Sequence, residues 1–183
     1  INPIARFFLV NFIIVPFRAK KSAKLYEHIW TQEGSPLITH SIKQKELLQK
    51  SLGDTYVVEL GMRYQSPSTE SAFKKLVNQK VESIVVIPLY PHWASSSTES
   101  TIVEIKRVAQ KFNYKNFKIV EKFYDNEDYL NASVDVAKKY NIIEYDHILF
   151  SYHGLPERQV TKIYPNHCEL NESCCSAISE KNK

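Results

Sequence analysis

The sequence predicts an α/β fold in which helices cover both faces of a doubly wound parallel sheet of flavodoxin-like βαβ units. Two observations carry this prediction. From residue 55 onwards, short apolar runs alternate with longer stretches of helical character. Strands that alternate with helices of this length are typical of βαβ units, with helices on both faces of the sheet. The length of 183 residues is also sufficient for one such domain and its core.

Capping and turn residues set the expected boundaries of the elements. Gly53 is expected to cap a helix over residues 38–51, and Ser66 with Pro67 is expected to begin a helix that runs to residue 80. The other helices are expected over residues 23–30, 98–112 and 126–140. Strands are expected over residues 55–60, 83–89, 117–123 and 147–152.

The composition argues against several classes of site. Hydrophobic content of 43% and charged content of 24% are ordinary for a soluble globular protein. A net charge of +4 without a basic stripe gives no reason to expect nucleic acid as a partner. The chain has no G-x-G-x-x-G, no P-loop and no G-x-S-x-G. Dinucleotide, nucleoside triphosphate and α/β-hydrolase sites are therefore not expected.

The longest apolar stretch, "FFLVNFIIVPF" at residues 7–17, is too short to span a bilayer. No small-residue cleavage site follows it, so a signal peptide is not indicated. Our first expectation is a core helix, and the alternative is a short helix at a pocket lip or a membrane surface. We expect a cytoplasmic protein, with peripheral membrane contact through residues 7–17 as the alternative.

Three unusual segments follow expected strands: "GMRYQSPS", "YPHWASSS" and "HGLPER". Ligands of open α/β sheets bind beyond the carboxyl ends of the strands, so we expect these segments to share one rim. Aromatic faces there suit a large apolar ligand, and guanidinium groups suit carboxylates. A histidine could move protons or bind a metal. The simpler alternatives are a structural Arg-Tyr pair and a satisfied loop histidine. The residues expected at the rim are Arg63, Tyr64, Tyr90, His92, Trp93 and His153.

Four ordered segments make the sequence resemble the ferrochelatase family. They are "PFRAKKSAKLYEHIWTQEGSPL", "MRYQSPSTESAF", "PLYPHWASSSTEST" and "FSYHGLPERQ", and the resemblance runs from Pro3 to about Pro165. It implies a chelatase-like fold and the insertion of Fe²⁺, as substrate, into protoporphyrin IX or coproporphyrin III during haem biosynthesis. Two pyrrole protons are lost in this reaction, and pyrrole N–H groups are weak acids, so a positioned base is needed.

The resemblance also implies roles for individual residues. His153 matches the family's histidine, interpreted as metal ligand, proton acceptor or both. Arg63 and Tyr64 match a pair that lines the pocket opposite that histidine. Tyr90 and Trp93 occupy aromatic loop positions. Three further positions match porphyrin contacts: Arg18, Tyr26 and Ser35. Glu99 stands where the family usually has a glycine.

The three cysteines, Cys168, Cys174 and Cys175, do not form a disulfide framework. Some bacterial ferrochelatases carry [2Fe–2S] clusters, and these residues could supply three thiolate ligands, with a fourth beyond Lys183. Three free thiols are the simpler interpretation, and we favour it slightly.

The chain begins Ile-Asn-Pro, and Met62 is its only methionine. We expect a truncated fold: residues 1–165 as an N-terminal chelatase domain lacking its first strand, and residues 166–183 as the start of a connection to a missing second domain. In the family that second half carries an acidic residue facing the histidine, so this span alone is expected to be inactive. Oligomeric state is not predicted.

Two other functions are compatible with the residues. One is a non-catalytic tetrapyrrole or metal carrier on the same fold, which would keep the aromatic walls and lose the acidic partner of His153. The other is a related cobalt or nickel chelatase. That group also uses strand-end histidines, but it lacks the pairing of "MRY" with "LYPHW" seen here.

Overall fold

The computed structural model describes residues 2–163, 171, 173 and 176. The chain forms two compact units, residues 1–79 and 80–183, and each is described by itself. Helices and strands are mixed, and β1 and β2 form a small parallel sheet. This agrees with the predicted α/β class.

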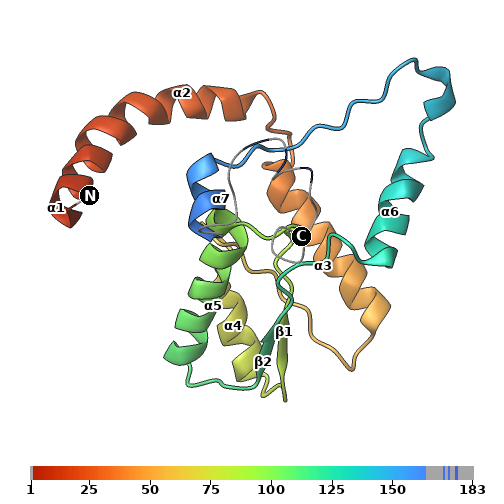
Figure 1. Cartoon of the computed structure of the whole chain (residues 1–183). Helices are drawn as coiled ribbons and strands as arrows, with labels where there is room; N and C mark the ends of the chain where they lie inside the picture. Colours follow the sequence, from red (N-terminus) through yellow and green to blue (C-terminus); the bar gives the residue numbers. More distant parts are fainter. Residues whose placement is uncertain (1, 164–170, 172, 174–175, 177–183) are drawn as a thin grey trace. The chain divides into compact units, whose positions relative to one another are not determined.

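The first unit begins with a nearly continuous helical stretch of α1 (Pro3–Phe8), a π-helical turn (Leu9–Ile14) and α2 (Val15–Glu27) (Figure 1). Pro16 lacks an N–H, and its ring would crowd the preceding turn of a regular α-helix. The wider π turn lies immediately before it. All described residues of this stretch are exposed, so the expectation of a core helix over residues 7–17 is wrong. Within the described part of the chain, no helix meets the length and apolarity that a membrane span requires.

A tight turn separates α2 from α3 (Pro36–Leu52). Thr31 and Gly34 exchange two backbone hydrogen bonds of 3.0 Å, and Gly34 adopts a φ of +100° that favours glycine. Ser35 is the N-cap of α3, and Pro36 occupies its first turn. Gly53 ends the helix as predicted, with a φ of +68° and its N–H donated to the Gln49 carbonyl at 3.0 Å.

The expected strand over residues 55–60 is not formed. The side-chain amide of Gln49 bonds this segment instead. Its Nε2 donates to the Tyr56 carbonyl at 2.8 Å, and its Oε1 accepts from the Val58 N–H at 2.8 Å. A strand exists only where a second backbone supplies the ladder, and among the described residues no neighbouring strand pairs with this segment.

Helix α4 (Thr69–Asn78) begins two residues later than the predicted start at Pro67. Ser68, rather than Ser66, is the N-cap, and its hydroxyl accepts from the Ser71 N–H at 3.1 Å. Pro67 is engaged elsewhere, because its carbonyl accepts from the Met62 N–H at 2.7 Å. The helix buries Ala72 and Phe73.

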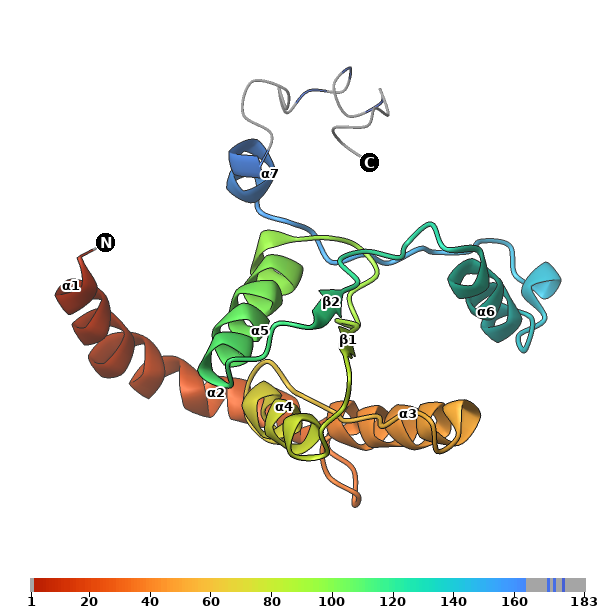
Figure 2. The ribbon, with the colours of Figure 1, turned by 90° about the horizontal axis from the view of Figure 1, so that it is seen from below.

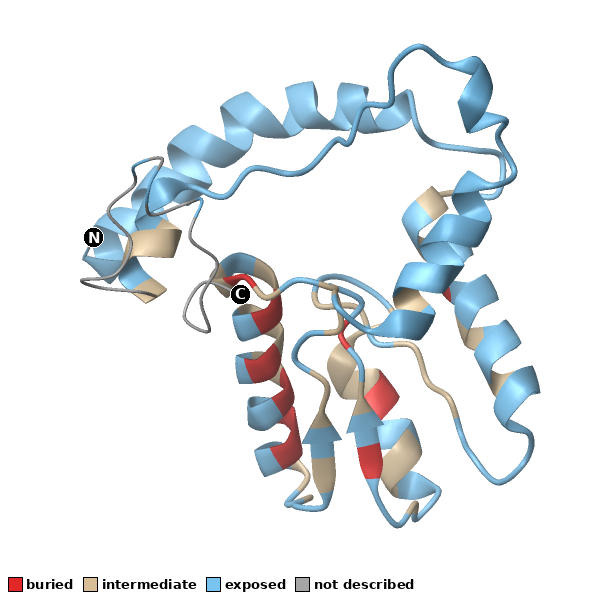
Figure 3. Ribbon diagram, turned by 45° about the vertical axis from the view of Figure 1, so that its right-hand side comes forward, coloured by how far each residue is buried: buried red, intermediate tan, exposed pale blue. Residues whose placement is uncertain are grey.

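The second unit is built on β1 (Ile84–Val86) and β2 (Phe117–Ile119), which pair in parallel with Ile84 opposite Phe117. Between them in sequence lie a π-helical turn (Ser95–Glu99) and α5 (Ser100–Lys111). Figure 2 shows the strands side by side, with α5 near them. One side of α5 carries the buried stripe visible in Figure 3, and helical spacing places its members on one face: Ile102, Ile105, Val108 and Ala109.

The rest of the second unit is less packed. Helix α6 (Glu127–Ala137) lies within the range 126–140 expected for a helix, and Asn126 is its N-cap. A 3₁₀ turn (Ile142–Glu144) and α7 (Glu157–Ile163) follow. The expected strand over residues 147–152 is not formed. Within the described part of the chain this segment makes no backbone hydrogen bond to another element, and Leu149 is 90% exposed. An apolar run without a neighbouring strand has nothing to pair with.

Candidate active site

A closed loop presents Arg63 and Tyr64 in the first unit. Met62 joins both ends of this loop, because its N–H donates to the Pro67 carbonyl and its own carbonyl accepts from the Thr69 N–H at 3.2 Å. The Arg63 guanidinium carbon lies 4.6 Å from the centre of the Tyr64 ring. This cation–π contact holds the two predicted site residues together, while 69% of Tyr64 stays exposed.

Gly61 allows this loop to approach α4 closely. A Cβ at this position would lie 3.0 Å from the Thr69 Cα, which is backbone and cannot move aside cheaply. The close approach therefore favours glycine at this position, where the chain passes the first turn of α4.

The other residues of the first unit that the resemblance predicted to contact a porphyrin lie on or next to helices. Arg18 and Tyr26 are both exposed residues of α2. Ser35 caps α3 through its backbone carbonyl, which accepts from the N–H groups of Ile38 and Thr39 at 3.0 Å. Its hydroxyl makes no capping hydrogen bond.

In the second unit, residues 88–94 follow β1 and are called the aromatic loop. It contains Tyr90, His92 and Trp93; Trp93 is half-buried and the other two are exposed. The loop is joined to the chain beyond β2, because the Phe123 N–H donates to the Pro91 carbonyl at 3.0 Å. Thr98, which is fully buried, donates its hydroxyl to the His92 carbonyl at 3.3 Å.

Two residues of this region were missed by sequence reasoning. Tyr124 stacks on His92, with ring centres 5.3 Å apart and planes 10° from parallel. Thr98 anchors the loop as just described. The rule that placed the other segments at one rim applies equally to the chain after residue 119, because β2 is parallel to β1. Applied to every strand, it would have included Tyr124.

His153 lies in the exposed chain between the 3₁₀ turn and α7, and it is itself exposed. The helix that follows contacts the region after the aromatic loop, because the Ser95 hydroxyl donates to Gln159 Oε1 at 3.3 Å. The structure therefore ties the chain that follows His153 to the end of the aromatic loop, although it forms no strand leading to His153.

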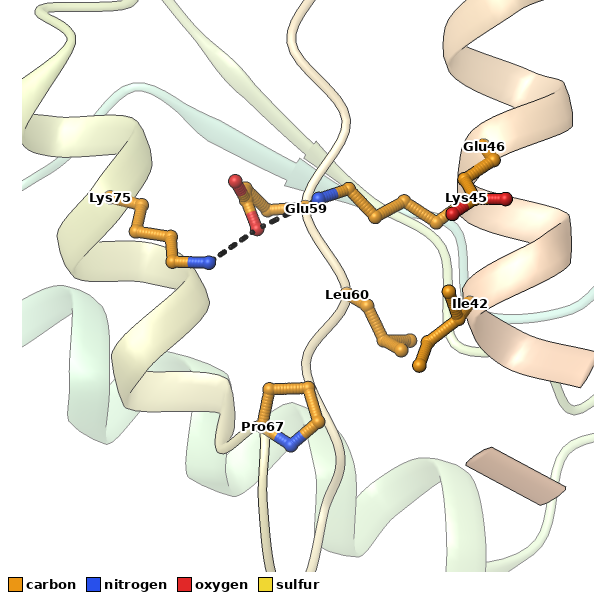
Figure 4. A pocket seen from close by; sticks show the side chains of 7 residues that line it. All are labelled: Ile42, Lys45, Glu46, Glu59, Leu60, Pro67 and Lys75. Atoms are coloured by element: carbon orange, nitrogen blue, oxygen red, sulfur yellow. Dashed lines mark hydrogen bonds and ion pairs between the residues drawn. The ribbon is translucent and has the colours of Figure 1, made fainter. Parts of the chain in front are cut away.

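A charged cavity of about 170 Å³ lies in the first unit and contains none of the predicted site residues (Figure 4). One carboxylate oxygen of Glu59, Oε2, forms ion pairs with the Lys45 Nζ at 3.4 Å and the Lys75 Nζ at 3.2 Å. Glu59 is 12% exposed in its side chain, so this triad links α3 and α4 to the 55–60 segment. The remaining lining residues are Ile42, Glu46, Leu60 and Pro67.

No preformed metal cluster is found where the structure describes the chain: no three histidine, cysteine or carboxylate side chains gather there. Cys168, Cys174 and Cys175 lie outside the described residues.

Comparison with known proteins supplies the family. The sequence model of the ferrochelatase family matches residues 1–182. A protein named ferrochelatase from Coxiella burnetii strain CbuK_Q154 is 37% identical over 185 residues, covering 98% of this chain and 51% of its own length. One of the same name from Legionella pneumophila strain Paris is 39% identical over 182 residues, covering 98% of this chain and 53% of its own length. The chain thus spans about half the length of the curated relatives it matches.

Proposed function

This chain belongs to the ferrochelatase family, and from that premise we propose that the full-length protein inserts Fe²⁺ into a porphyrin during haem biosynthesis. The observation that carries the proposal is the match over nearly the whole chain, which includes all four segments quoted above. The substrate is protoporphyrin IX or coproporphyrin III. Iron enters as Fe²⁺, two pyrrole N–H bonds break, and two protons leave.

His153 is proposed as the group that receives a pyrrole proton, binds the incoming Fe²⁺, or does both in turn. Its exposed position supports this, because an imidazole that acts on a ligand has to be reachable. Proton transfer by a positioned side chain contributes about 10²–10⁴-fold to a rate.

The macrocycle is proposed to rest against the aromatic side chains of both loops. Tyr64 and Tyr90 offer exposed ring surface, and Trp93 adds a third wall. Arg63 lines the pocket beside Tyr64, and the porphyrin carboxylates are assigned to Arg18, with hydroxyl donors from Tyr26 and Ser35. The Ser35 hydroxyl suits this role because it caps no helix N–H. Guanidinium forks bind carboxylates in two parallel hydrogen bonds.

We propose that residues 1–165 form the N-terminal domain of the full-length protein and lie on a doubly wound parallel sheet, with residues 166–183 leading on from it. The parallel pairing of β1 and β2 supports this architecture. The extended, unpaired segments 55–60 and 147–152 are then strands that acquire neighbours in the full-length protein.

A peripheral membrane contact through residues 7–17 is also proposed for a protein located in the cytoplasm. Phe7, Phe8 and Phe12 form an exposed aromatic group with ring centres 5.6–6.5 Å apart. Basic residues flank it at Arg6 and Arg18, and no acidic residue occurs before Glu27. Apolar burial plus attraction to anionic lipids is how interfacial helices bind. Co-sedimentation with anionic and with zwitterionic vesicles tests this contact.

For Cys168, Cys174 and Cys175 two states stay as alternatives: free thiols, or three of four ligands of a [2Fe–2S] cluster. Visible absorption and iron and sulfide analysis of the purified full-length protein distinguish them. Three thiols that react freely with a thiol reagent exclude the cluster.

The proposed activity is tested by incubating the full-length protein anaerobically with Fe²⁺ and each porphyrin and following the absorption bands of metal insertion. Porphyrin binding without insertion would indicate a tetrapyrrole carrier. Insertion of Co²⁺ or Ni²⁺ into another macrocycle, without iron insertion, would indicate a different chelatase. The span 1–183 is expected to bind porphyrin weakly and to insert no iron, so turnover equal to that of the full-length protein would show that these residues suffice.

A further inference from the structure

The two segments beyond the carboxyl ends of β1 and β2 remain joined after the strands end. The Val120 N–H donates to the Val86 carbonyl at 2.9 Å, and the Phe123 N–H donates to the Pro91 carbonyl at 3.0 Å. The aromatic loop therefore has a fixed neighbour along its course, namely residues 120–124. Its backbone is held from a second side by the Thr98 hydroxyl.

Within this frame the side chain of Tyr124 holds that of His92. The two rings are nearly parallel, 10° apart, with centres separated by 5.3 Å. His92 is exposed, so the stack, rather than surrounding core, limits where its ring can turn. The Lys122 ammonium lies 5.5 Å from the centre of the Tyr124 ring and adds a second contact to that ring.

The contact uses the ring of Tyr124 and not its hydroxyl. The Tyr124 hydroxyl is buried and has no hydrogen-bond partner among the described residues. A buried hydroxyl without a partner is unfavourable, so its presence gives the stack no support. This provides a matched pair of variants, because Tyr124→Phe keeps the ring while Tyr124→Leu removes it.

We propose that Tyr124 is a positioning residue: by stacking on His92 it fixes the aromatic loop, and so sets the direction of Tyr90 and Trp93 toward the porphyrin. Tyr90 and Trp93 lie on either side of His92 in sequence, so a loop that turns at His92 moves both. The proposal rests on the porphyrin site proposed above, but the stack itself does not.

Two measurements on the full-length protein test it. The first is amide hydrogen exchange of the peptide containing residues 88–94, which does not depend on activity. The second is steady-state kinetics of iron insertion, with KM for porphyrin separated from kcat. Four variants are compared: Tyr124→Leu, Tyr124→Phe, His92→Leu and His92→Phe.

We expect both leucine variants to speed exchange in residues 88–94 and to raise KM for porphyrin by about two- to tenfold, the range set by the energy of an aromatic pair. Both phenylalanine variants should keep the exchange rate and the KM of the wild-type protein, because each keeps two stacked rings. Tyr129→Leu is the matched control. It removes another aromatic pair, Phe123 with Tyr129, also at 5.3 Å, which does not include His92. It should leave KM unchanged.

Unchanged exchange in Tyr124→Leu would overturn the proposal. So would a fall in kcat with unchanged KM in His92→Phe, because the imidazole would then act chemically rather than through its ring face. If the wild-type protein inserts no iron and binds no porphyrin, the proposed function fails. The exchange data would still decide whether Tyr124 holds the loop.

Discussion

The aromatic loop and the segment carrying His153 were both predicted to follow strands, but in the structure only the aromatic loop follows a paired strand. The aromatic loop follows β1, which pairs with β2, and it is held by the Phe123 N–H, the Thr98 hydroxyl and the Tyr124 ring. Residues 147–152 are extended and exposed, without a paired strand among the described residues. An apolar run is therefore not enough to make a strand, because strand formation depends on a neighbouring backbone.

The largest expected effect tests the function of the exposed segment. His153→Ala in the full-length protein should lower the rate of iron insertion by about 10²–10⁴-fold, the contribution of a positioned proton carrier. Its free energy of unfolding should not change, because His153 is exposed. His147→Ala is the control, since it removes another exposed imidazole of the same region. Retention of most of the wild-type rate in His153→Ala would show that the role is wrongly assigned.

A second prediction tests the packing of α5, the helix that follows the aromatic loop in sequence. Ile105 is 1% exposed on the buried face of α5, and Ile105→Ala should lower the free energy of unfolding by about 2–5 kcal/mol. On the same helix Val103 is 62% exposed, and Val103→Ala should cost less than about 0.5 kcal/mol. Denaturant unfolding of both variants provides the measurement. Equal losses would mean that the burial pattern of α5 does not describe the folded protein.

A third prediction concerns the first unit, where the exposed residue Arg18 is proposed to bind the porphyrin carboxylates. Arg18→Leu should weaken porphyrin binding by about 1.5–3 kcal/mol, the range for hydrogen bonds to charged groups. An uncharged porphyrin ester should bind both proteins similarly. Arg6→Leu, on α1 of the same helical stretch, is the control. The same loss for acid and ester would indicate that Arg18 acts through structure.

The smallest expected effect concerns two threonines near the start of α5. Thr98→Val removes the hydrogen bond to the His92 carbonyl and should cost about 0.5–1.5 kcal/mol of unfolding free energy. The Thr101 hydroxyl is buried with no partner among the described residues, so Thr101→Val should be neutral or stabilising. Thermal unfolding of the two variants provides the comparison, and the reverse order would contradict the assigned bond.

Local chemistry made several features predictable from the sequence. The cap of α3 by Gly53 was predicted, and it depends on residues close in sequence, because the Gly53 N–H donates to the Gln49 carbonyl. Helices were also predicted where α5 and α6 form. The family also followed from sequence, because four motifs in order are specific even when each is short. The Arg63–Tyr64 contact joins sequence neighbours and needs only the loop that Met62 closes.

Tertiary structure decided what depends on partners distant in sequence. The side-chain amide of Gln49 bonds residues 56 and 58, and Pro67 bonds Met62, so a predicted strand and a predicted cap were both displaced. Tyr124 reached the rim because two parallel strands pair across more than thirty intervening residues, Ile84 with Phe117. Helix caps, tight turns and the spacing of apolar residues along a helix depend on residues that are close in sequence. Strand pairing and ring stacking depend on which surfaces meet, and no single segment of the sequence carries that information.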